Sequence, residues 1–339
     1  MKVLLIQTAF IGDVILATPL IEQLQRTFPD ATIDFALRKG NESLLLQHPH
    51  LRKVFIWRKK EEKYRGLWRM LRDIRRERYD WVINCQRFAA SGVLTMLSGA
   101  RHTVGFDKNP LSLFFSRRVA HRFGTAAQPL HEVERNLSLI AHLMPETPNS
   151  KQQTPNFQTP KLYPSVADYV GASQLSAGSD KYVCIAPTSV WFTKQYPAHK
   201  WIEMIRRFPA GMTVFLLGAP GDQPACETIR EALPEHKVLN IAGKLSFLES
   251  AALMEGAAMN YVNDSAPMHL ASAVNAPVTA VFCSTVPAFG FTPLSQNARV
   301  VETDVALDCR PCGLHGYKSC PKGHFRCAET INPAAFKMP

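Results

Sequence analysis

Short runs of β-branched and leucine residues alternate with helical patterns along most of this chain, and that alternation restricts the possible folds more than any other feature. Alternating strands and helices form parallel sheets whose faces the helices cover, so we predict an α/β fold. Strands are predicted at 3–7, 32–37, 53–57, 81–85, 102–106, 182–187, 213–218, 238–242, 259–263 and 278–283. Helices are predicted at 14–27, 42–47, 61–77, 90–97, 132–143, 198–208, 225–233, 247–255 and 267–273.

The alternation stops between residues 145 and 164, where the proline-rich sequence PETPNSKQQTPNFQTPKLYP offers little that can form a core. A chain of 339 residues is long enough for two domains on either side of such a segment. We therefore expect one Rossmann-like domain at 1–150, a linker leading into the second domain at 151–180, and a second Rossmann-like domain at 181–339.

Positive charge is concentrated in the first half. The chain carries a net charge of +11, and residues 1–150 hold 23 Lys and Arg against 14 Asp and Glu. Within Arg52–Arg78, 12 basic residues meet four acids. Leu67, Leu71 and Ile74 recur there at helical spacing, so the segment is either the solvated face of an amphipathic helix or a surface for an anionic partner. Nucleic acid, an anionic membrane surface and a phosphorylated acceptor all fit that charge.

The most apolar stretch, from Val3 to Ile21, does not have the pattern of a membrane span. Asp13 and Pro19 interrupt it, and a carboxylate at the centre of a bilayer is costly. Lys2 is the only basic residue before this stretch, and Asp13 interrupts it, which is a poor match to a signal peptide. We expect a cytoplasmic protein.

The first strand-to-helix junction reads VLLIQTAFIGDVILATPL and contains Gly12 but not the three glycines of a dinucleotide fingerprint. Asp13 follows that glycine at the helix start. Its position suits the capping of the first turn, and it also lies where α/β folds place ligand chemistry.

Two junctions in the second half present groups suited to a nucleotide. Thr188, Ser189, Thr193 and Lys194 follow one strand, and hydroxyls with one ammonium suit a phosphate group as well as an ordinary polar loop. Asp222 follows the next strand in FLLGAPGD, where a carboxylate either accepts from a ribose hydroxyl or caps a helix.

A third junction, MNYVNDSAPMHL, delivers Asp264 and Ser265 to the start of a helix that has Pro267 near its first turn. The exposed N–H groups of such a helix start form an anion site. A carboxylate beside a phosphate is repelled unless it caps the helix or binds sugar hydroxyls. His269, one turn further, either reaches the same ligand or is an ordinary helix histidine.

These segments together resemble the lipopolysaccharide heptosyltransferases of glycosyltransferase family 9, with the greatest similarity to the heptosyltransferase II type. The resemblance lies in VLLIQTAFIGDVILATPLIEQLQRTFPDATIDF, in the Thr188–Lys194 loop, in NDSAPMHLASAVNAPVTAVFCST and in the tail CRPCGLHGYKSCPKGHFRC. It implies a GT-B fold, in which the parallel sheets of two Rossmann-like domains face each other across a cleft. Two departures are Ala266, where glycine is usual, and Gln7-Thr8, where we expect Arg and Ser.

The resemblance also implies a reaction. ADP-L-glycero-D-manno-heptose would bind the C-terminal domain, and the phosphorylated inner core of lipid A would enter from the N-terminal domain, with Asp13 as general base and Lys194 stabilising the departing ADP. Inversion at the anomeric carbon and no catalytic metal or other cofactor are expected, with peripheral contact at the cytoplasmic face of the inner membrane. The implied donor-binding residues are Thr188, Ser189, Lys194, Asp222, Asp264, Ser265, Ala266, Met268 and His269. The implied acceptor or membrane surface is Arg69, Arg72, Arg75 and Arg76.

The eight cysteines fall into two groups. Cys85, Cys184, Cys226 and Cys283 lie in apolar contexts and are expected to be buried thiols. Cys309, Cys312, Cys320 and Cys327 cluster in the tail, where four thiolates could hold a structural zinc, although zinc, disulfides and free thiols all stay open.

Two other functions are weighed. A transferase of the same family acting on another sugar nucleotide differs only in which hydroxyls it recognises. A nucleic-acid-binding protein would use the basic segment, but the chain lacks interleaved aromatic residues and any known nucleic-acid-reading motif, so no nucleic acid partner is expected.

Overall fold

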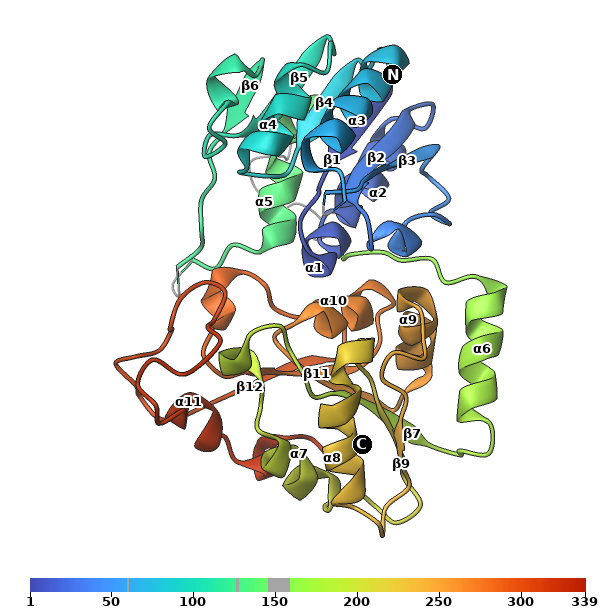
Figure 1. Cartoon of the computed structure of the whole chain (residues 1–339), viewed down its shortest axis with the longest axis vertical. Helices are drawn as coiled ribbons and strands as arrows, with labels where there is room; N and C mark the ends of the chain where they lie inside the picture. Colours follow the sequence, from blue (N-terminus) through green and yellow to red (C-terminus); the bar gives the residue numbers. More distant parts are fainter. Residues whose placement is uncertain (60, 126–127, 146–158) are drawn as a thin grey trace. The chain divides into compact units, whose positions relative to one another are not determined.

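The computed structural model describes residues 1–59, 61–125, 128–145 and 159–339, which form two compact units. Unit 1 contains Met1–Phe123 and Leu130–Tyr163, and unit 2 contains Gly124–Pro129 and Pro164–Pro339. Each unit has a parallel sheet with helices packed on it (Figure 1). Residues 146–158, which make up most of the proline-rich segment 145–164, lie outside the described residues.

Unit 1 is built on a six-stranded parallel sheet in the order β3-β2-β1-β4-β5-β6. Its central strands are mostly apolar because helices cover both faces of such a sheet, and β1 buries Val3 to Ile6 completely. The strands are β1 Lys2–Ile6, β2 Thr32–Arg38, β3 Lys53–Trp57, β4 Trp81–Asn84, β5 His102–Phe106 and β6 Arg117–Val119. The helices are α1 Ile11–Ile15, α2 Thr18–Thr27, α3 Lys63–Glu77, α4 Ala89–Met96 and α5 Glu132–Ser138, with 3-10 turns at Glu42–Leu44, Ser112–Phe114 and Ala141–Leu143.

Unit 2 repeats this architecture with the order β12-β11-β10-β7-β8-β9. The strands are β7 Tyr182–Ala186, β8 Thr213–Leu216, β9 Val238–Asn240, β10 Met259–Asn263, β11 Val278–Phe282 and β12 Ala298–Glu302. The helices are α6 Val166–Ser176, α7 Ala198–Ile205, α8 Gln223–Glu231, α9 Phe247–Gly256, α10 Ala266–Ala273 and α11 Arg326–Glu329, with 3-10 turns at Phe192–Lys194, Pro220–Asp222, Pro287–Phe289 and Pro333–Ala335.

All ten predicted strands are present, so the predicted α/β class with parallel sheets is confirmed. The helix predicted at 14–27 is wrong in one respect, because it is divided into α1 and α2. At the division the Thr18 hydroxyl donates to the Ile15 carbonyl oxygen (2.8 Å), and Pro19 supplies no N–H for a continuous helix. The region predicted at 151–180 as a linker includes the unpredicted helix α6, which begins with a capping box of Ser165 and Asp168.

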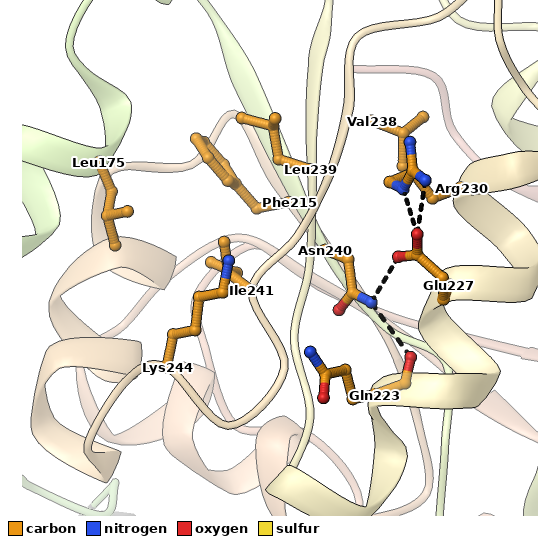
Figure 2. Close-up of a pocket in the computed structure, with 10 residues that line it drawn as sticks. All are labelled: Leu175, Phe215, Gln223, Glu227, Arg230, Val238, Leu239, Asn240, Ile241 and Lys244. Atoms are coloured by element: carbon orange, nitrogen blue, oxygen red, sulfur yellow. Dashed lines mark hydrogen bonds and ion pairs between the residues drawn. The ribbon is translucent and has the colours of Figure 1, made fainter.

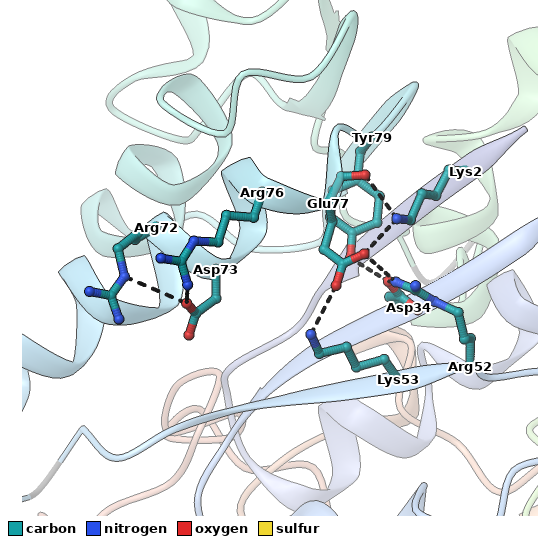
Figure 3. Close-up of polar contacts among 9 residues, drawn as sticks. All are labelled: Lys2, Asp34, Arg52, Lys53, Arg72, Asp73, Arg76, Glu77 and Tyr79. Carbon is teal, nitrogen blue, oxygen red and sulfur yellow. Dashed lines mark hydrogen bonds and ion pairs between the residues drawn. The ribbon is translucent and has the colours of Figure 1, made fainter.

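A cluster of charged side chains closes the amino edge of the unit 1 sheet (Figure 3). Glu77, at the end of α3, accepts hydrogen bonds from the side chains of Lys2, Arg52 (2.7 Å) and Lys53 (2.9 Å). Arg52 also pairs with the fully buried Asp34, which accepts the hydroxyl of Tyr79. These bonds join α3 to β1, β2 and β3, and those with the three cations hold the pKa of Glu77 far below its usual range.

We expect Glu77→Gln to lower the free energy of unfolding at pH 7 by about 1–2 kcal/mol, because three cations lose their shared carboxylate. A carboxyl group with a lowered folded-state pKa stabilises the fold above its unfolded pKa of about 4.3, and the contribution is lost as pH falls through the folded value. The difference between variant and wild type should therefore be full at pH 6–7 and shrink below about pH 4. Denaturant titrations across pH measure it.

Glu61→Gln is the matched control, since Glu61 pairs with Lys39 on the exposed surface. Such a pair contributes little. If the two variants lose the same stability, Glu77 does not link α3 to the sheet in the way described.

Candidate functional site

In each sheet the first strand of the unit lies in the middle: β1 lies between β2 and β4, and β7 lies between β8 and β10. The strand order therefore reverses direction beside this first strand. Open α/β sheets bind ligands at such a topological switch point, at the carboxyl ends of the strands. In unit 1 this point lies between β1 and β4. Thr8, just after β1, donates its hydroxyl to the side-chain oxygen of Gln86, just after β4, at 2.7 Å. Both side chains are buried. The two strand ends are therefore tied together beneath the turn that carries Asp13.

Asp13 lies in the first turn of α1, directly after β1. Its Oδ2 accepts the Phe10 backbone N–H at 3.1 Å, so the capping role expected from its position is present. The Asp13 carboxylate affects the pKa of two neighbouring groups. The pKa of Arg38 is lowered by burial, and Asp13 opposes part of that shift. The pKa of Glu132 is raised by burial, and Asp13 adds to the rise.

Two pairs of contacting side chains lie near Asp13. The Arg38 guanidinium lies 4.6 Å from the centre of the Phe10 ring. Glu132, at the start of α5, is paired with the buried Arg135, whose Nε donates to Glu132 Oε2 at 2.7 Å. The carboxylate of Asp13 is thus held at the carboxyl edge of the sheet, where a proton acceptor for a bound hydroxyl would have to lie.

In unit 2 the switch point lies between β7 and β10, and the structure brings two predicted residues together there. Lys194, in the turn after β7, places its Nζ 2.7 Å from Oδ2 of Asp264, which follows β10. Both side chains are largely buried, with exposed fractions of 14% and 7%. The pair places an ammonium group beside a carboxylate. The ammonium suits an anionic part of a ligand, and the carboxylate suits hydroxyl groups of the same ligand.

Three further residues support this pair: Thr193, which belongs to the predicted polar loop, and Ser284 and Thr285, which were not among the predicted site residues. Thr285, after β11, donates its hydroxyl to Asp264 Oδ2 at 2.7 Å. The buried Thr193 accepts the Ser284 hydroxyl at 3.0 Å and the Tyr317 backbone N–H at 2.8 Å. The polar run Cys-Ser-Thr at a strand end was the available signal, since β11 neighbours β10 in the sheet.

Arg310 in the tail holds the loop that carries Thr285. Its guanidinium donates to the carbonyl oxygens of Cys283 (2.7 Å), Phe282 (3.1 Å) and Thr285 (2.8 Å), and it pairs with Glu302. The Cys312 N–H also donates to the Ser284 carbonyl oxygen at 3.0 Å. The tail therefore supports the Lys194–Asp264 pair indirectly, through the loop of Thr193 and the loop of Ser284 and Thr285.

We expect Arg310→Lys to raise the KM for the expected nucleotide sugar several-fold and to lower the free energy of unfolding by about 1–3 kcal/mol, because a compact ammonium cannot reproduce the spread donors of the planar guanidinium that contact three carbonyl oxygens and Glu302. Arg230→Lys, on the exposed surface of α8, is the control. Affinity for the nucleoside diphosphate alone should stay unchanged if Arg310 acts through Thr285 on Asp264. Equal weakening of both ligands would assign Arg310 a general structural role.

The predicted residue Asp222 closes a tight turn after β8. Its Oδ2 accepts the Ala219 N–H at 2.7 Å. A Cβ on Gly218 would lie 2.7 Å from the Cβ of Asp222, so this turn requires glycine. Asp222 therefore has the capping role expected from its position, and it follows β8, the strand next to β7.

The start of α10 places the other predicted residues. Ser265 precedes the helix in extended conformation, and Ala266 is its first residue. The buried side chain of Asn263 organises the junction, accepting the Tyr196 N–H at 2.8 Å and donating to the Thr188 carbonyl oxygen at 3.3 Å. Met268 and His269 are buried, and the Met268 N–H donates to Ser265, so Met268 belongs to the core beneath the junction. Ser189 accepts from the Gln195 side chain through its carbonyl oxygen at 2.7 Å.

A pocket of about 530 Å³ lies beside the edge strand β9 of unit 2 (Figure 2). Its only carboxylate, Glu227, is already bonded to Arg230 and to the Asn240 side chain (2.9 Å). Neither Lys194 nor Asp264 lines it. The pocket is therefore separate from the candidate site.

The cysteines divide as expected. Cys85, Cys184, Cys226 and Cys283 are all buried, which confirms that prediction. In the tail, burial raises the pKa of Cys327 to about 11, and the neighbouring thiols Cys312, Cys320 and Cys309 contribute. Cys309 Sγ lies 3.9 Å from Nε2 of His324.

The end of the tail is anchored in the core of unit 2. Phe325, Cys327, Ala328, Ile331 and Phe336 are buried in the main cluster of unit 2. Within the described ranges no three His, Cys, Asp or Glu side chains are grouped so as to hold a metal ion, and structural zinc remains a prediction that metal analysis of the purified protein tests.

The four basic candidates are all on α3, which belongs to unit 1. Arg69 is paired with Glu62 at 2.9 Å. Arg72, Arg75 and Arg76 lie nearer the end of the helix and line a separate cavity. None of the helices that the structure describes is long and apolar enough to cross a membrane.

Comparison with known proteins agrees with this geometry. The sequence model described as "Glycosyltransferase family 9 (heptosyltransferase)" matches residues 67–316. A curated relative, lipopolysaccharide heptosyltransferase 3 of Escherichia coli, is 29% identical over 85% of this chain and 85% of its own length.

Solved structures share the fold. The structure of E. coli ADP-heptose lipopolysaccharide heptosyltransferase II has a TM-score of 0.78 at 22% identity, covering 98% of this chain and 96% of that one. E. coli heptosyltransferase WaaC with ADP has a TM-score of 0.70 at 22% identity, covering 88% and 92%. The expected GT-B class, with two Rossmann-like units, is therefore confirmed.

Proposed function

This chain belongs to glycosyltransferase family 9, the heptosyltransferase family, and we propose that it transfers heptose from ADP-L-glycero-D-manno-heptose to the inner core of lipopolysaccharide, with inversion and without a catalytic metal. It is thus a glycosyltransferase of the lipopolysaccharide heptosyltransferase family. The assignment to the type II enzymes and the identity of the donor are part of the proposal. A solved relative bound to ADP supports an adenine nucleotide as the leaving group.

The observation that carries the proposal is the Lys194–Asp264 pair at the switch point of unit 2. A nucleotide sugar presents a diphosphate next to a ring of hydroxyls. Lys194 is suited to the diphosphate, and Asp264 accepts hydrogen bonds from sugar hydroxyls. Donor binding would replace their mutual ion pair by one contact for each. Unit 2 is accordingly the proposed donor-binding unit.

The proposed step is a single displacement. The acceptor hydroxyl oxygen attacks the anomeric carbon from the face opposite the diphosphate, the bond from that carbon to the diphosphate oxygen breaks, and ADP leaves with the electron pair. Asp13 takes the proton of the hydroxyl, as a general base does. The configuration at the anomeric carbon inverts.

Negative charge that develops on ADP needs fixed positive groups. Lys194 supplies one, and the N–H groups at the start of α10, after Ser265, supply the positive end of a helix dipole. Together they perform the charge stabilisation for which some transferases use a divalent cation. Thr188, Ser189, Asp222, Ala266 and His269 surround the same strand ends and complete the proposed donor site.

The acceptor is proposed to bind unit 1 near Asp13. Because the acceptor is lipid-linked, the enzyme would work on the cytoplasmic face of the inner membrane in peripheral contact with it.

The experiment that tests this function is transfer from ADP-heptose to a defined inner-core acceptor in the presence of a metal chelator. We expect one ADP released for each heptose transferred, full activity with chelator, and a new glycosidic bond of inverted anomeric configuration by NMR. Retention of configuration, or activity that chelator abolishes and metal restores, would contradict the mechanism.

A further inference from the structure

The exposed face of α3 combines aromatic and basic side chains. Tyr64 and Trp68 expose 68% and 56% of their surface to solvent. Their neighbours on that face are Arg65, Arg69, Arg72 and Arg76, and the opposite face buries Leu67, Met70, Leu71 and Ile74. Trp and Tyr side chains are enriched at membrane–water interfaces, and basic side chains are attracted to anionic lipid surfaces.

A groove at the end of this helix concentrates the charge. It has a volume of about 570 Å³ and is lined by Trp68, Leu71, Arg72, Arg75, Arg76, Arg78 and Leu97. Among the residues that the structure describes, Asp73 is the only carboxylate within ion-pair distance of these arginines, 3.7 Å from Arg72 and 3.6 Å from Arg76. Figure 3 shows Arg72 and Arg76 on either side of Asp73, apart from the Glu77 cluster. The groove therefore has an excess of positive charge.

Support of the helix does not explain four arginines. Cations in the last turn of a helix favour its dipole, but that effect is small for exposed side chains and is limited to the last turn. Arg75 also has a structural contact, because its Nη1 donates to the Leu97 carbonyl oxygen at 3.0 Å. Arg78 moreover adopts a left-handed backbone (φ 52°) at the position after the helix, where glycine is preferred. Arg78 therefore keeps a charged side chain at a backbone position that glycine would occupy with less strain.

The groove is also remote from the candidate site within unit 1. α3 ends beside Lys2, at the amino end of β1, because Lys2 Nζ donates to the Glu77 carbonyl oxygen at 2.8 Å. Asp13 follows the carboxyl end of the same strand. The length of the strand, roughly 13 Å, separates the two edges, so the groove is not where an acceptor hydroxyl would meet Asp13.

We propose that the exposed face of α3 docks this protein on an anionic phospholipid bilayer, with the arginine groove holding a lipid phosphate and Trp68 inserted at the interface. Guanidinium groups bind phosphate oxygens with two parallel hydrogen bonds, which matches a headgroup phosphodiester. This inference rests on the proposed function in one respect, because a lipid-linked acceptor places the enzyme at a membrane. It assigns the docking surface to the edge of unit 1 opposite Asp13.

The test is co-sedimentation of the full chain with vesicles of phosphatidylcholine alone or mixed with phosphatidylglycerol. The variant Arg72→Gln/Arg76→Gln/Arg78→Gly removes three charges, and the glycine suits the left-handed backbone, so folding should be retained. Binding to mixed vesicles should fall about a hundredfold, since each basic residue near an anionic surface contributes roughly fivefold. Wild-type binding should weaken as salt rises.

Arg206→Gln/Arg207→Gln is the matched control, because these exposed arginines follow the end of α7 in unit 2. It should bind vesicles almost as wild type does. Brominated lipid should quench tryptophan fluorescence in wild type, and Trp68→Phe should lose most of that quenching.

Transfer to a water-soluble, deacylated acceptor separates this inference from the proposed function. The triple variant should keep wild-type kcat and KM there while losing vesicle binding. Wild-type vesicle binding with no heptose transfer would contradict the function and leave the docking surface supported. An unchanged vesicle affinity in the triple variant would overturn the docking surface, and so would a raised KM of that variant for the soluble acceptor. In the wild type, displacement from mixed vesicles by inorganic phosphate as strong as by competing vesicles would also overturn it. Preferential binding of a nucleic acid duplex over vesicles would do the same.

Discussion

We expect Asp13→Asn to lower kcat by about 10²–10⁴, because a general base contributes that range and an amide cannot take the proton. Affinity for ADP-heptose should stay nearly unchanged, since the donor is assigned to unit 2. Asparagine keeps the shape of the side chain and an oxygen that can accept the Phe10 N–H, so the turn after β1 should survive. Single-turnover kinetics together with calorimetric titration of the donor measure both effects.

Asp168→Asn is the matched control for this prediction. Asp168 occupies the same position in the capping box of α6, where its Oδ2 accepts the Ser165 N–H at 2.7 Å. That variant loses the same kind of capping carboxylate and should retain wild-type kcat. Near-normal turnover in Asp13→Asn would reduce Asp13 to a helix cap.

Lys194→Met should lower kcat/KM for the donor by about 10²–10³, which is the usual effect of removing one group that stabilises a developing negative charge. The Lys194→Met variant should also bind ADP itself more weakly. Asp264→Asn should behave differently, because it frees Lys194 from its 2.7 Å ion pair. ADP affinity should be maintained or increased in that variant, whereas ADP-heptose should bind more weakly through the loss of its sugar contacts.

Isothermal titration with both ligands distinguishes the two residues. The double variant Lys194→Met/Asp264→Asn controls for the unpaired buried charge that each single variant leaves behind. Equal losses for ADP and ADP-heptose in Asp264→Asn would contradict the assignment of Asp264 to the sugar.

The parts of this site that sequence predicts are those at the ends of parallel strands. Asp13, Lys194 and Asp264 each follow an apolar run of strand length, and the carboxyl ends of neighbouring parallel strands converge. The pairing of Lys194 with Asp264 required the strand order, which places β7 beside β10 although they are far apart in sequence. Local patterns carry no information on that order.

Other features had no periodic signal. α6 buries only Ala172 and leaves Val166, Tyr169 and Val170 exposed, so it has no buried apolar face, and the strand β6 is short and largely exposed. Arg310 reaches the β11 loop from an irregular tail, and its role depends on three carbonyl oxygens that no side-chain pattern reveals. The division of the first helix was not predicted, although Pro19 is the sixth residue of the predicted range 14–27; it lies in the first turn of α2, where a helix tolerates proline.

The most direct test of the central claim is a competition among nucleotide sugars for one defined inner-core acceptor, with products identified by mass. The enzyme would receive ADP-heptose, ADP-glucose, UDP-glucose and GDP-mannose at equal concentrations. We predict a single product that carries one added heptose, formed with release of ADP. A product that carries a hexose, or one formed with release of UDP or GDP, would contradict the account and assign the chain to another donor within family 9.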